Sequence, residues 1–106
     1  MEKVIVLGLS GCRHCNALVE ALKNSNILFE FRDADLKEHS ALADRMESLL
    51  KVNNYPMAII ERGEGAKYFY LANTLDEAKE IPISFATKVG CVSTDSMVVA
   101  IKKYIK

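Results

Sequence analysis

The chain has 106 residues, half of them apolar, and its 14 basic side chains balance 14 acidic ones. This length and composition are typical of one domain around a single core, which we expect to span residues 1–106. A net charge of zero speaks against nucleic acid or an anionic membrane surface as a partner. No apolar run approaches the roughly 20 residues that a membrane-spanning helix requires.

The cysteine count and the first residues indicate the compartment. Three cysteines are an odd number and too few for a disulfide scaffold. The first residues lead directly into a strand pattern and lack the cleavage site of a signal peptide. We therefore expect a cytoplasmic protein whose cysteines serve chemistry.

The first half of the chain alternates strand and helix patterns. Residues 4–9 form a continuous apolar run, which is typical of a strand buried on both faces. A helix follows, with apolar residues at helical spacing, and it ends at the polar residues 24–26. Residues 27–32 alternate as in a half-covered strand, and residues 40–51 have the pattern of an amphipathic helix.

The second half begins with two strand patterns and ends with a helix. Residues 57–60 and 67–71 flank a glycine-containing turn at 62–65, which predicts an antiparallel hairpin. Ser93 or Thr94 is expected to cap the final helix.

An insert of about residues 72–89 separates the hairpin from the final helix. Thr74 is a suitable cap for a short helix over residues 75–80, and Pro82 would end that helix. The insert either decorates the fold or lines the groove that selects partners, since long connections often serve function.

Together, these elements predict an α/β fold with a four-stranded mixed sheet and helices on both faces. A right-handed crossover makes the first two strands parallel, and the hairpin lies antiparallel beside them. The insert is then an extra segment between the last strand and the last helix.

The motif Cys12-Arg13-His14-Cys15 lies between the first strand and the first helix. Two thiols three positions apart on the first turn of a helix can approach closely enough to form a disulfide. The unpaired N–H groups and the positive dipole end of the helix favour a thiolate there. A C-x-x-C motif behind a strand therefore indicates a redox pair, although the same residues also suit a metal.

A metal site is the main alternative for these cysteines. Structural zinc takes four protein ligands, and the only further candidates are His14, His39 and Cys91. No second C-x-x-C is present. We predict no metal site, and we keep a metal or iron–sulfur carrier that uses the C-x-x-C cysteines as the alternative function.

The C-x-x-C motif, the strand before it and Tyr55-Pro56 about 40 residues later resemble the thioredoxin superfamily. The compact arrangement resembles a glutaredoxin over residues 1–71 and again from Gly90. This resemblance implies a thioredoxin-like three-layer sandwich, with a cis proline at Pro56.

The resemblance also implies roles for the motif. Cys12 would be the nucleophile and Cys15 the resolving thiol, and a Cys in such a motif has a pKa below the free value of about 8.5. Arg13 and His14 would modulate Cys12 by favouring its thiolate. A low thiol pKa improves the leaving group, so we predict a potential less negative than the roughly −270 mV of thioredoxin.

The substrate site implied by the resemblance lies beside the cysteines. It comprises Tyr55, Pro56, Gly90, Cys91, Ser93, Thr94 and Asp95. Tyr55 would pair with substrate through its backbone, the alternative being a packing residue before a turn proline. Cys91 is either an ordinary half-buried side chain or a third thiol near the site.

The expected function is thiol–disulfide oxidoreduction by dithiol exchange, in a monomer without a bound cofactor. The substrates would be protein disulfides or glutathione mixed disulfides, with glutathione as a co-substrate. Leu9 replaces a lysine that glutaredoxins commonly use to bind glutathione, so the electron donor is either glutathione or thioredoxin reductase.

Overall fold

The computed structural model describes residues 2–62, 67–73, 80–83, 86–91 and 93–105. Its elements in chain order are β1 (Glu2–Gly8), α1 (Arg13–Asn24), β2 (Glu30–Asp33), the short 3₁₀ helix η1 (Lys37–His39), α2 (Ser40–Leu50), β3 (Met57–Arg62), β4 (Lys67–Asn73), β5 (Glu80–Ile83), β6 (Ala86–Cys91) and α3 (Thr94–Tyr104).

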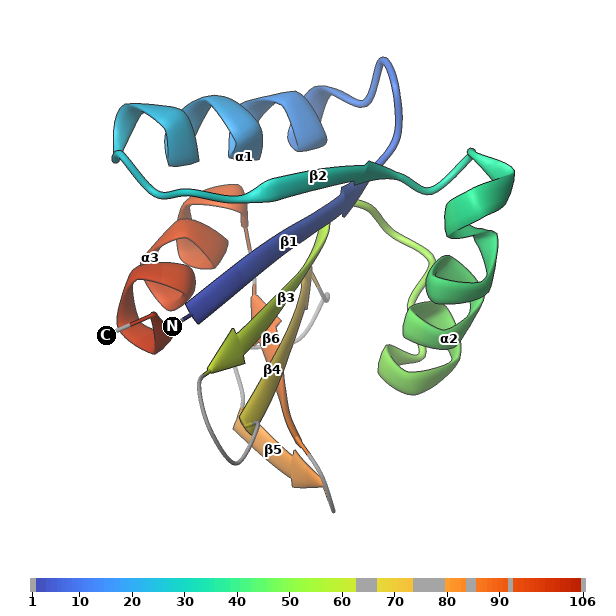
Figure 1. Ribbon diagram of the computed structural model, residues 1–106. Helices are drawn as coiled ribbons and strands as arrows, with labels where there is room; N and C mark the ends of the chain where they lie inside the picture. The colour runs from blue at the N-terminus through green and yellow to red at the C-terminus, as the bar shows by residue number, and fades with distance from the viewer. Residues whose placement is uncertain (1, 63–66, 74–79, 84–85, 92, 106) are drawn as a thin grey trace.

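The strands form one mixed sheet in the order β2-β1-β3-β4-β6-β5 (Figure 1). β1 and β2 are parallel, and β3 and β4 form an antiparallel hairpin, as the sequence predicts. β3 also pairs antiparallel with β1, which joins the two halves of the chain in one sheet. Of the turn predicted at residues 62–65, only Arg62 is among the described residues, and it ends β3.

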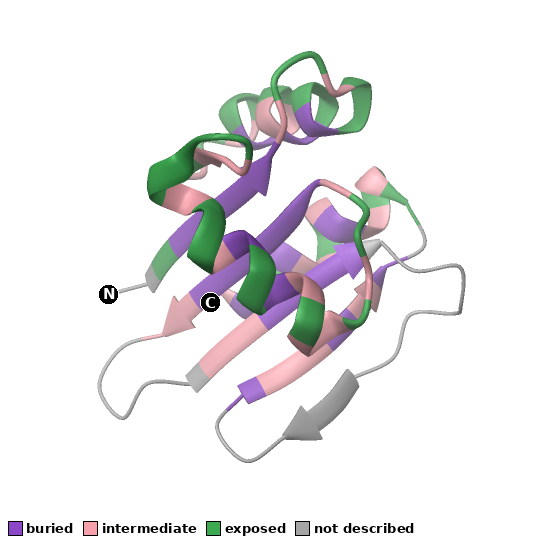
Figure 2. Cartoon of the chain, turned by 90° about the vertical axis from the view of Figure 1, so that its right-hand side faces the viewer, coloured by how far each residue is buried: buried purple, intermediate pink, exposed green. Residues whose placement is uncertain are grey.

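The helices cover both faces of the sheet and make three layers. α1 and α3 pack on one face and α2 on the other (Figure 1). The outward surfaces of the helices are exposed, whereas the central strands are buried (Figure 2). Within the described part of the chain, every helix is too short or too polar to span a membrane.

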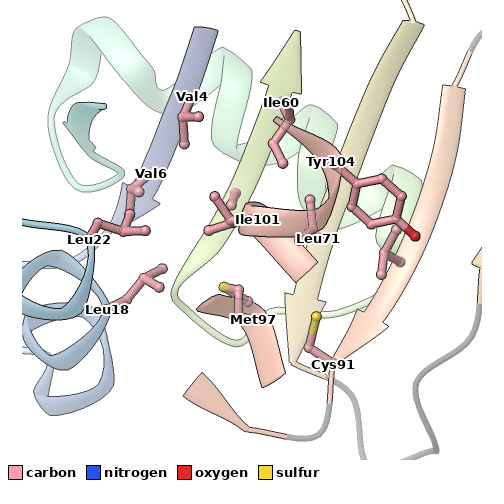
Figure 3. Packing of buried hydrophobic residues seen from close by; sticks show 12 residues of the cluster. Val4, Val6, Leu18, Leu22, Ile60, Leu71, Cys91, Met97, Ile101 and Tyr104 are labelled. Atoms are coloured by element: carbon pink, nitrogen blue, oxygen red, sulfur yellow. The ribbon is translucent and has the colours of Figure 1, made fainter. Parts of the chain in front are cut away.

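The apolar run of β1 serves both layers because successive side chains of a strand point to opposite faces. Val4 and Val6 belong to the core under α1 and α3, whose packing Figure 3 shows. Ile5 and Leu7 belong to the core under α2. A strand buried on both faces requires this continuous apolar sequence, so the prediction is confirmed for residues 4–8. Leu9 lies beyond the end of β1 and is half-buried.

The strand count was predicted wrongly: the described residues form a sheet of six strands rather than four. Part of the insert forms β5 and β6, and β6 pairs parallel with β4. Pro82 lies inside β5, an edge strand, where its missing N–H is tolerated. The helix predicted over residues 75–80 and its cap Thr74 lie outside the described residues except Glu80, which begins β5.

The register of the sheet determines which segments meet at its edge. Leu7 pairs with Met57, Met57 with Ala72, and Ala72 with Gly90. The carboxyl ends of β1, β4 and β6 and the start of β3 therefore share one edge. The cysteine motif follows β1 at this edge, and Tyr55-Pro56 precedes β3 there.

Candidate active site

The two cysteines of the motif lie at the start of α1. Cys12 is the N-cap residue, and the backbone N–H of Cys15 points at its Sγ atom, 3.3 Å away. Cys12 and Cys15 form a disulfide, and their Cα atoms are 5.2 Å apart. Cys12 is half-buried and Cys15 is completely buried, so the sulfur of Cys12 is the one that a substrate can reach.

The surroundings of Cys12 favour negative charge on its sulfur after reduction. An N-cap side chain satisfies a free N–H group of the first turn, and the helix dipole adds positive potential there. The first turn contains no acidic residue, and Arg13 and His14 stand on it as exposed side chains. This is the environment in which a cysteine is reactive as a thiolate.

Gly8 makes room for the buried sulfur. A Cβ atom on Gly8 would lie 3.1 Å from Cys15 Sγ and 2.9 Å from Phe31 Cε1. These distances are too short for a side chain, so β1 ends in a residue that lets α1 pack closely. Gly11 then turns the chain with a φ of 75°, which favours glycine.

The segment before β3 meets the motif from the other side. The Tyr55–Pro56 peptide bond is cis, the isomer that the resemblance implies. The carbonyl oxygen of Tyr55 lies 3.8 Å from Cys12 Sγ, although 43 positions separate the two residues. In the reduced protein, the Cys12 thiol can donate to this carbonyl.

Tyr55 is also held by helix α2. Its hydroxyl donates to Glu47 Oε2 at 2.7 Å. Burial raises the pKa of Tyr55 above its ordinary value, and the Glu47 hydrogen bond and the negative charges of Glu47, Asp44 and Asp35 raise it further. The tyrosine therefore stays a neutral donor at physiological pH.

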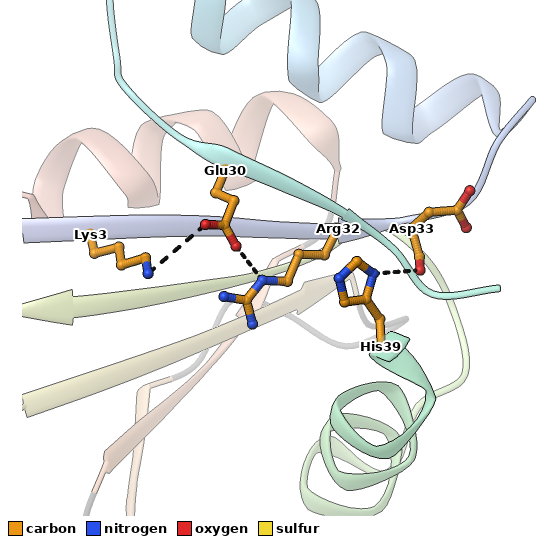
Figure 4. A network of polar contacts seen from close by, with 5 residues as sticks. All are labelled: Lys3, Glu30, Arg32, Asp33 and His39. Carbon is orange, nitrogen blue, oxygen red and sulfur yellow. Dashed lines mark hydrogen bonds and ion pairs between the residues drawn. The ribbon is translucent and has the colours of Figure 1, made fainter. Parts of the chain in front are cut away.

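The end of β2 supports the loop that carries Cys12. Asp33 accepts hydrogen bonds from Ser10 Oγ at 3.0 Å and from the N–H of Asp35 at 2.9 Å. Its backbone carbonyl accepts from Nδ1 of His39 at 3.1 Å (Figure 4). His39 thus joins η1 to β2 while remaining half-exposed.

A network of charged side chains lies on β2 before Asp33. Glu30 pairs with Arg32 and lies 3.9 Å from Lys3 on β1 (Figure 4). The hydrogen bond from Arg32 lowers the pKa of Glu30, which is exposed. An exposed pair of this kind contributes little stability, so its effect here is local.

The remaining predicted site residues lie further along the same edge. Gly90 and Cys91 are the last two residues of β6, and β4 separates them from β3. Since neighbouring strands lie about 4.8 Å apart, β6 is about 10 Å from β3. The structure therefore brings Cys12 and Cys15 together with Tyr55, but it places Gly90 and Cys91 two strands away.

Cys91 is buried in the core under α3, where Figure 3 shows it beside Met97. Its exposed fraction is 1%, and burial raises the pKa of its thiol to about 11. An inaccessible thiol with this pKa is a poor nucleophile at neutral pH. The structure thus assigns Cys91 to packing and separates it chemically from Cys12.

The polar residues predicted at the start of α3 lie in its cap and first turn. Ser93 caps the helix, as expected, by accepting from the N–H of Ser96 at 3.1 Å. Thr94 Oγ1 is buried without a hydrogen-bond partner among the described residues, and Asp95 is exposed in the first turn. Across the described residues, no three side chains of His, Cys, Asp or Glu gather as metal ligands would.

Three residues of the site escaped the sequence analysis: Ser10, Asp33 and Glu47. Ser10 follows β1 and Asp33 is the last residue of β2, and this position at a strand end is the signal that relates them to the edge of the sheet. Glu47 carries no such signal, because its contact with Tyr55 depends on how α2 packs against the sheet.

The comparison with protein families agrees with this geometry. The glutaredoxin family model matches residues 4–64, which include Cys12, Cys15, Tyr55 and Pro56. No curated protein and no solved structure matches the chain. The match spans more than half of the chain, so the protein belongs to the glutaredoxin family of thiol–disulfide oxidoreductases.

Proposed function

We propose that the protein is an enzyme that reduces disulfides by dithiol exchange between Cys12 and Cys15. The observation that carries this proposal is the placement of Cys12 Sγ at the start of α1. It lies 3.3 Å from the N–H of Cys15 and 3.8 Å from the carbonyl of Tyr55. The N–H of Cys15 stabilises the Cys12 thiolate, and the half-buried sulfur is accessible to substrate and adjacent to its resolving partner.

The exchange takes two steps. The Cys12 thiolate attacks one sulfur of the substrate disulfide, which forms a mixed disulfide and releases the other sulfur as a thiolate that takes up a proton. Cys15, deprotonated, then attacks Cys12 Sγ, forms the Cys12–Cys15 disulfide and releases the second substrate thiolate. Two electrons from a thiol donor restore the dithiol, so the cycle uses no bound cofactor.

The proposed substrates are protein disulfides or glutathione mixed disulfides, bound along the exposed edge of the sheet by a monomer. The backbone of Tyr55 would pair with the substrate next to its sulfur. The stretch from β3 to β6 is about 10 Å, which an extended segment of three residues spans. Ser93, Thr94 and Asp95 at the start of α3 would then contact its far end.

The proposed electron donor is either glutathione or thioredoxin reductase, and the proposed role is electron transport in the cytoplasm. Disulfides in a reducing compartment such as the cytoplasm are usually transient and catalytic, and a redox-active cysteine pair of this kind fits such a role. Leu9 offers no positive charge to a glutathione carboxylate, which favours thioredoxin reductase over glutathione as the electron donor.

Turnover of a small mixed disulfide tests the proposal, with glutathione, glutathione reductase and NADPH in one arm and thioredoxin reductase with NADPH in the other. We expect NADPH oxidation in at least one arm, its loss in Cys12→Ser and its retention in Cys91→Ser. Full turnover by Cys12→Ser would refute dithiol exchange. A zinc assay and an absorption spectrum of the same sample test the metal-carrier alternative, which requires bound metal.

A further inference from the structure

Tyr55 links two helices through opposite ends of the residue. Its hydroxyl donates to Glu47 on α2 at 2.7 Å, while its carbonyl oxygen faces Cys12 Sγ at the start of α1. The side chain of Glu47 is thus connected to the reactive sulfur through a single residue. Glu47 itself has no described contact with either cysteine, and its described link to them is the hydrogen bond from Tyr55.

The segment that carries Tyr55 has few other polar anchors. Residues 52–56 lie between α2 and β3 and belong to neither. Within the described part of the chain, their hydrogen-bonding contacts are the bond to Glu47 and the approach to Cys12. Packing of Pro56 and of the Tyr55 ring against the core completes the support.

We propose that Glu47 is a positioning residue of the exchange site, which holds Tyr55 so that its carbonyl faces Cys12. This inference rests on the proposed function, because it concerns the segment that would pair with the substrate. The Tyr55 hydroxyl stays protonated and a carboxylate can only accept, so at physiological pH Tyr55 is always the donor and Glu47 the acceptor. A hydrogen bond to a charged acceptor is stronger than one between neutral groups.

α2 also supplies a matched control. Asp44 lies three positions before Glu47, so the two carboxylates share one side of the helix. The negative charges of both raise the pKa of Tyr55, but only Glu47 accepts a hydrogen bond from it. Asp44→Asn therefore removes a nearby charge and leaves the bond intact.

The first experiment measures kcat and KM for a disulfide substrate in Glu47→Ala, Tyr55→Phe, the double variant, Glu47→Gln and Asp44→Asn. We expect Glu47→Ala and Tyr55→Phe each to raise KM about fivefold, with a smaller change in kcat. The double variant should be no worse than the poorer single variant, because both remove one bond. Glu47→Gln, whose carbonyl still accepts, and Asp44→Asn should stay within about twofold of the unchanged protein.

Three results would overturn the proposal: unchanged KM in Tyr55→Phe, effects that add in the double variant, or an Asp44→Asn variant that matches Glu47→Ala. Thermal unfolding of each variant accompanies the kinetics. Rescue by Glu47→Gln follows from a structural role as well as from a positioning role, because the amide still accepts the bond. The two roles are therefore separated by the titration of Cys12, which a fall in stability alone does not change.

A second measurement is independent of turnover: the pH dependence of Cys12 alkylation in the reduced protein. A thiol donates to the Tyr55 carbonyl and a thiolate cannot, so displacing this carbonyl should lower the pKa of Cys12 in Tyr55→Phe and Glu47→Ala. Asp44→Asn should leave it unchanged. An unchanged pKa in Tyr55→Phe would contradict the positioning role. A lowered pKa in a protein that reduces no disulfide would instead refute the proposed function alone.

Discussion

At the scale of single residues, the site depends on a few contacts of one sulfur atom. Cys12 Sγ meets a helix N–H on one side and the Tyr55 carbonyl on the other. These contacts have opposite effects on the thiol, because the N–H stabilises the thiolate and the carbonyl stabilises the protonated form. The helix dipole and the exposed Arg13 add to the first effect.

The reduction potential of the Cys12–Cys15 pair follows from this balance. Since a stabilised thiolate is a better leaving group, we expect a potential less negative than the roughly −270 mV of thioredoxin. Equilibration with glutathione buffers of known ratio measures it. Replacing Arg13 by alanine should shift the potential toward more negative values, and a value at or below that of thioredoxin would contradict the account.

Some residues of the site could be predicted from the sequence and others could not. Cys12 and Cys15 form a pair beside Tyr55, and the Tyr55–Pro56 bond is cis, as the motif and the resemblance imply. Glu47 could not be predicted, because its hydrogen bond spans two elements whose relative placement is a property of the packed core. The complete burial of Cys91 was also beyond the sequence, since β6 itself was not expected.

At the scale of elements, β6 is the feature that most changes the expected fold. It adds to β4 on the side away from β3, so the hairpin of the predicted sheet becomes interior. Within residues 86–91, burial recurs at Ala86, Val89 and Cys91, a short pattern that does not distinguish strand from loop. Pairing with β4 decides the outcome, and such non-local pairing overrides local preference.

Burial of the Cys91 thiol in β6 makes stability depend on alkaline pH. Burial raises its pKa from 9.0 to about 11, so the folded protein holds this proton more tightly than the unfolded chain. The resulting stability is present below pH 9 and is lost as the pH rises toward 11. Between about pH 8 and about pH 10, the unfolding free energy should fall by about 1 kcal/mol more than in Cys91→Ala.

Urea unfolding of the oxidised protein measures this difference, because the Cys12–Cys15 disulfide then does not titrate. The cavity left by Cys91→Ala lowers stability at both pH values equally and leaves the difference unaffected. If the unfolding free energy fell equally in the two proteins between these pH values, the pKa of the Cys91 thiol would not be raised by folding.

At the scale of the whole molecule, the sheet brings distant segments to one functional edge. The order of elements from β1 to β4 could be predicted, because the spacing of apolar residues is distinct in each strand and helix. The helices on both faces could be predicted as well, because the crossover between parallel strands is right-handed. The register then aligns the end of β1 with the start of β3, which places Cys12 beside Tyr55. The extension by β5 and β6 moves the start of α3 outward along this edge.

The central claim is that Cys12 receives the substrate and Cys15 releases it. The most direct test is mass spectrometry of reduced Cys15→Ser after incubation with oxidised glutathione or a disulfide peptide, followed by peptide mapping. We expect a stable mixed disulfide on Cys12, which disappears in the Cys12→Ser/Cys15→Ser double variant. An adduct on Cys91, or no adduct on Cys12, would contradict it.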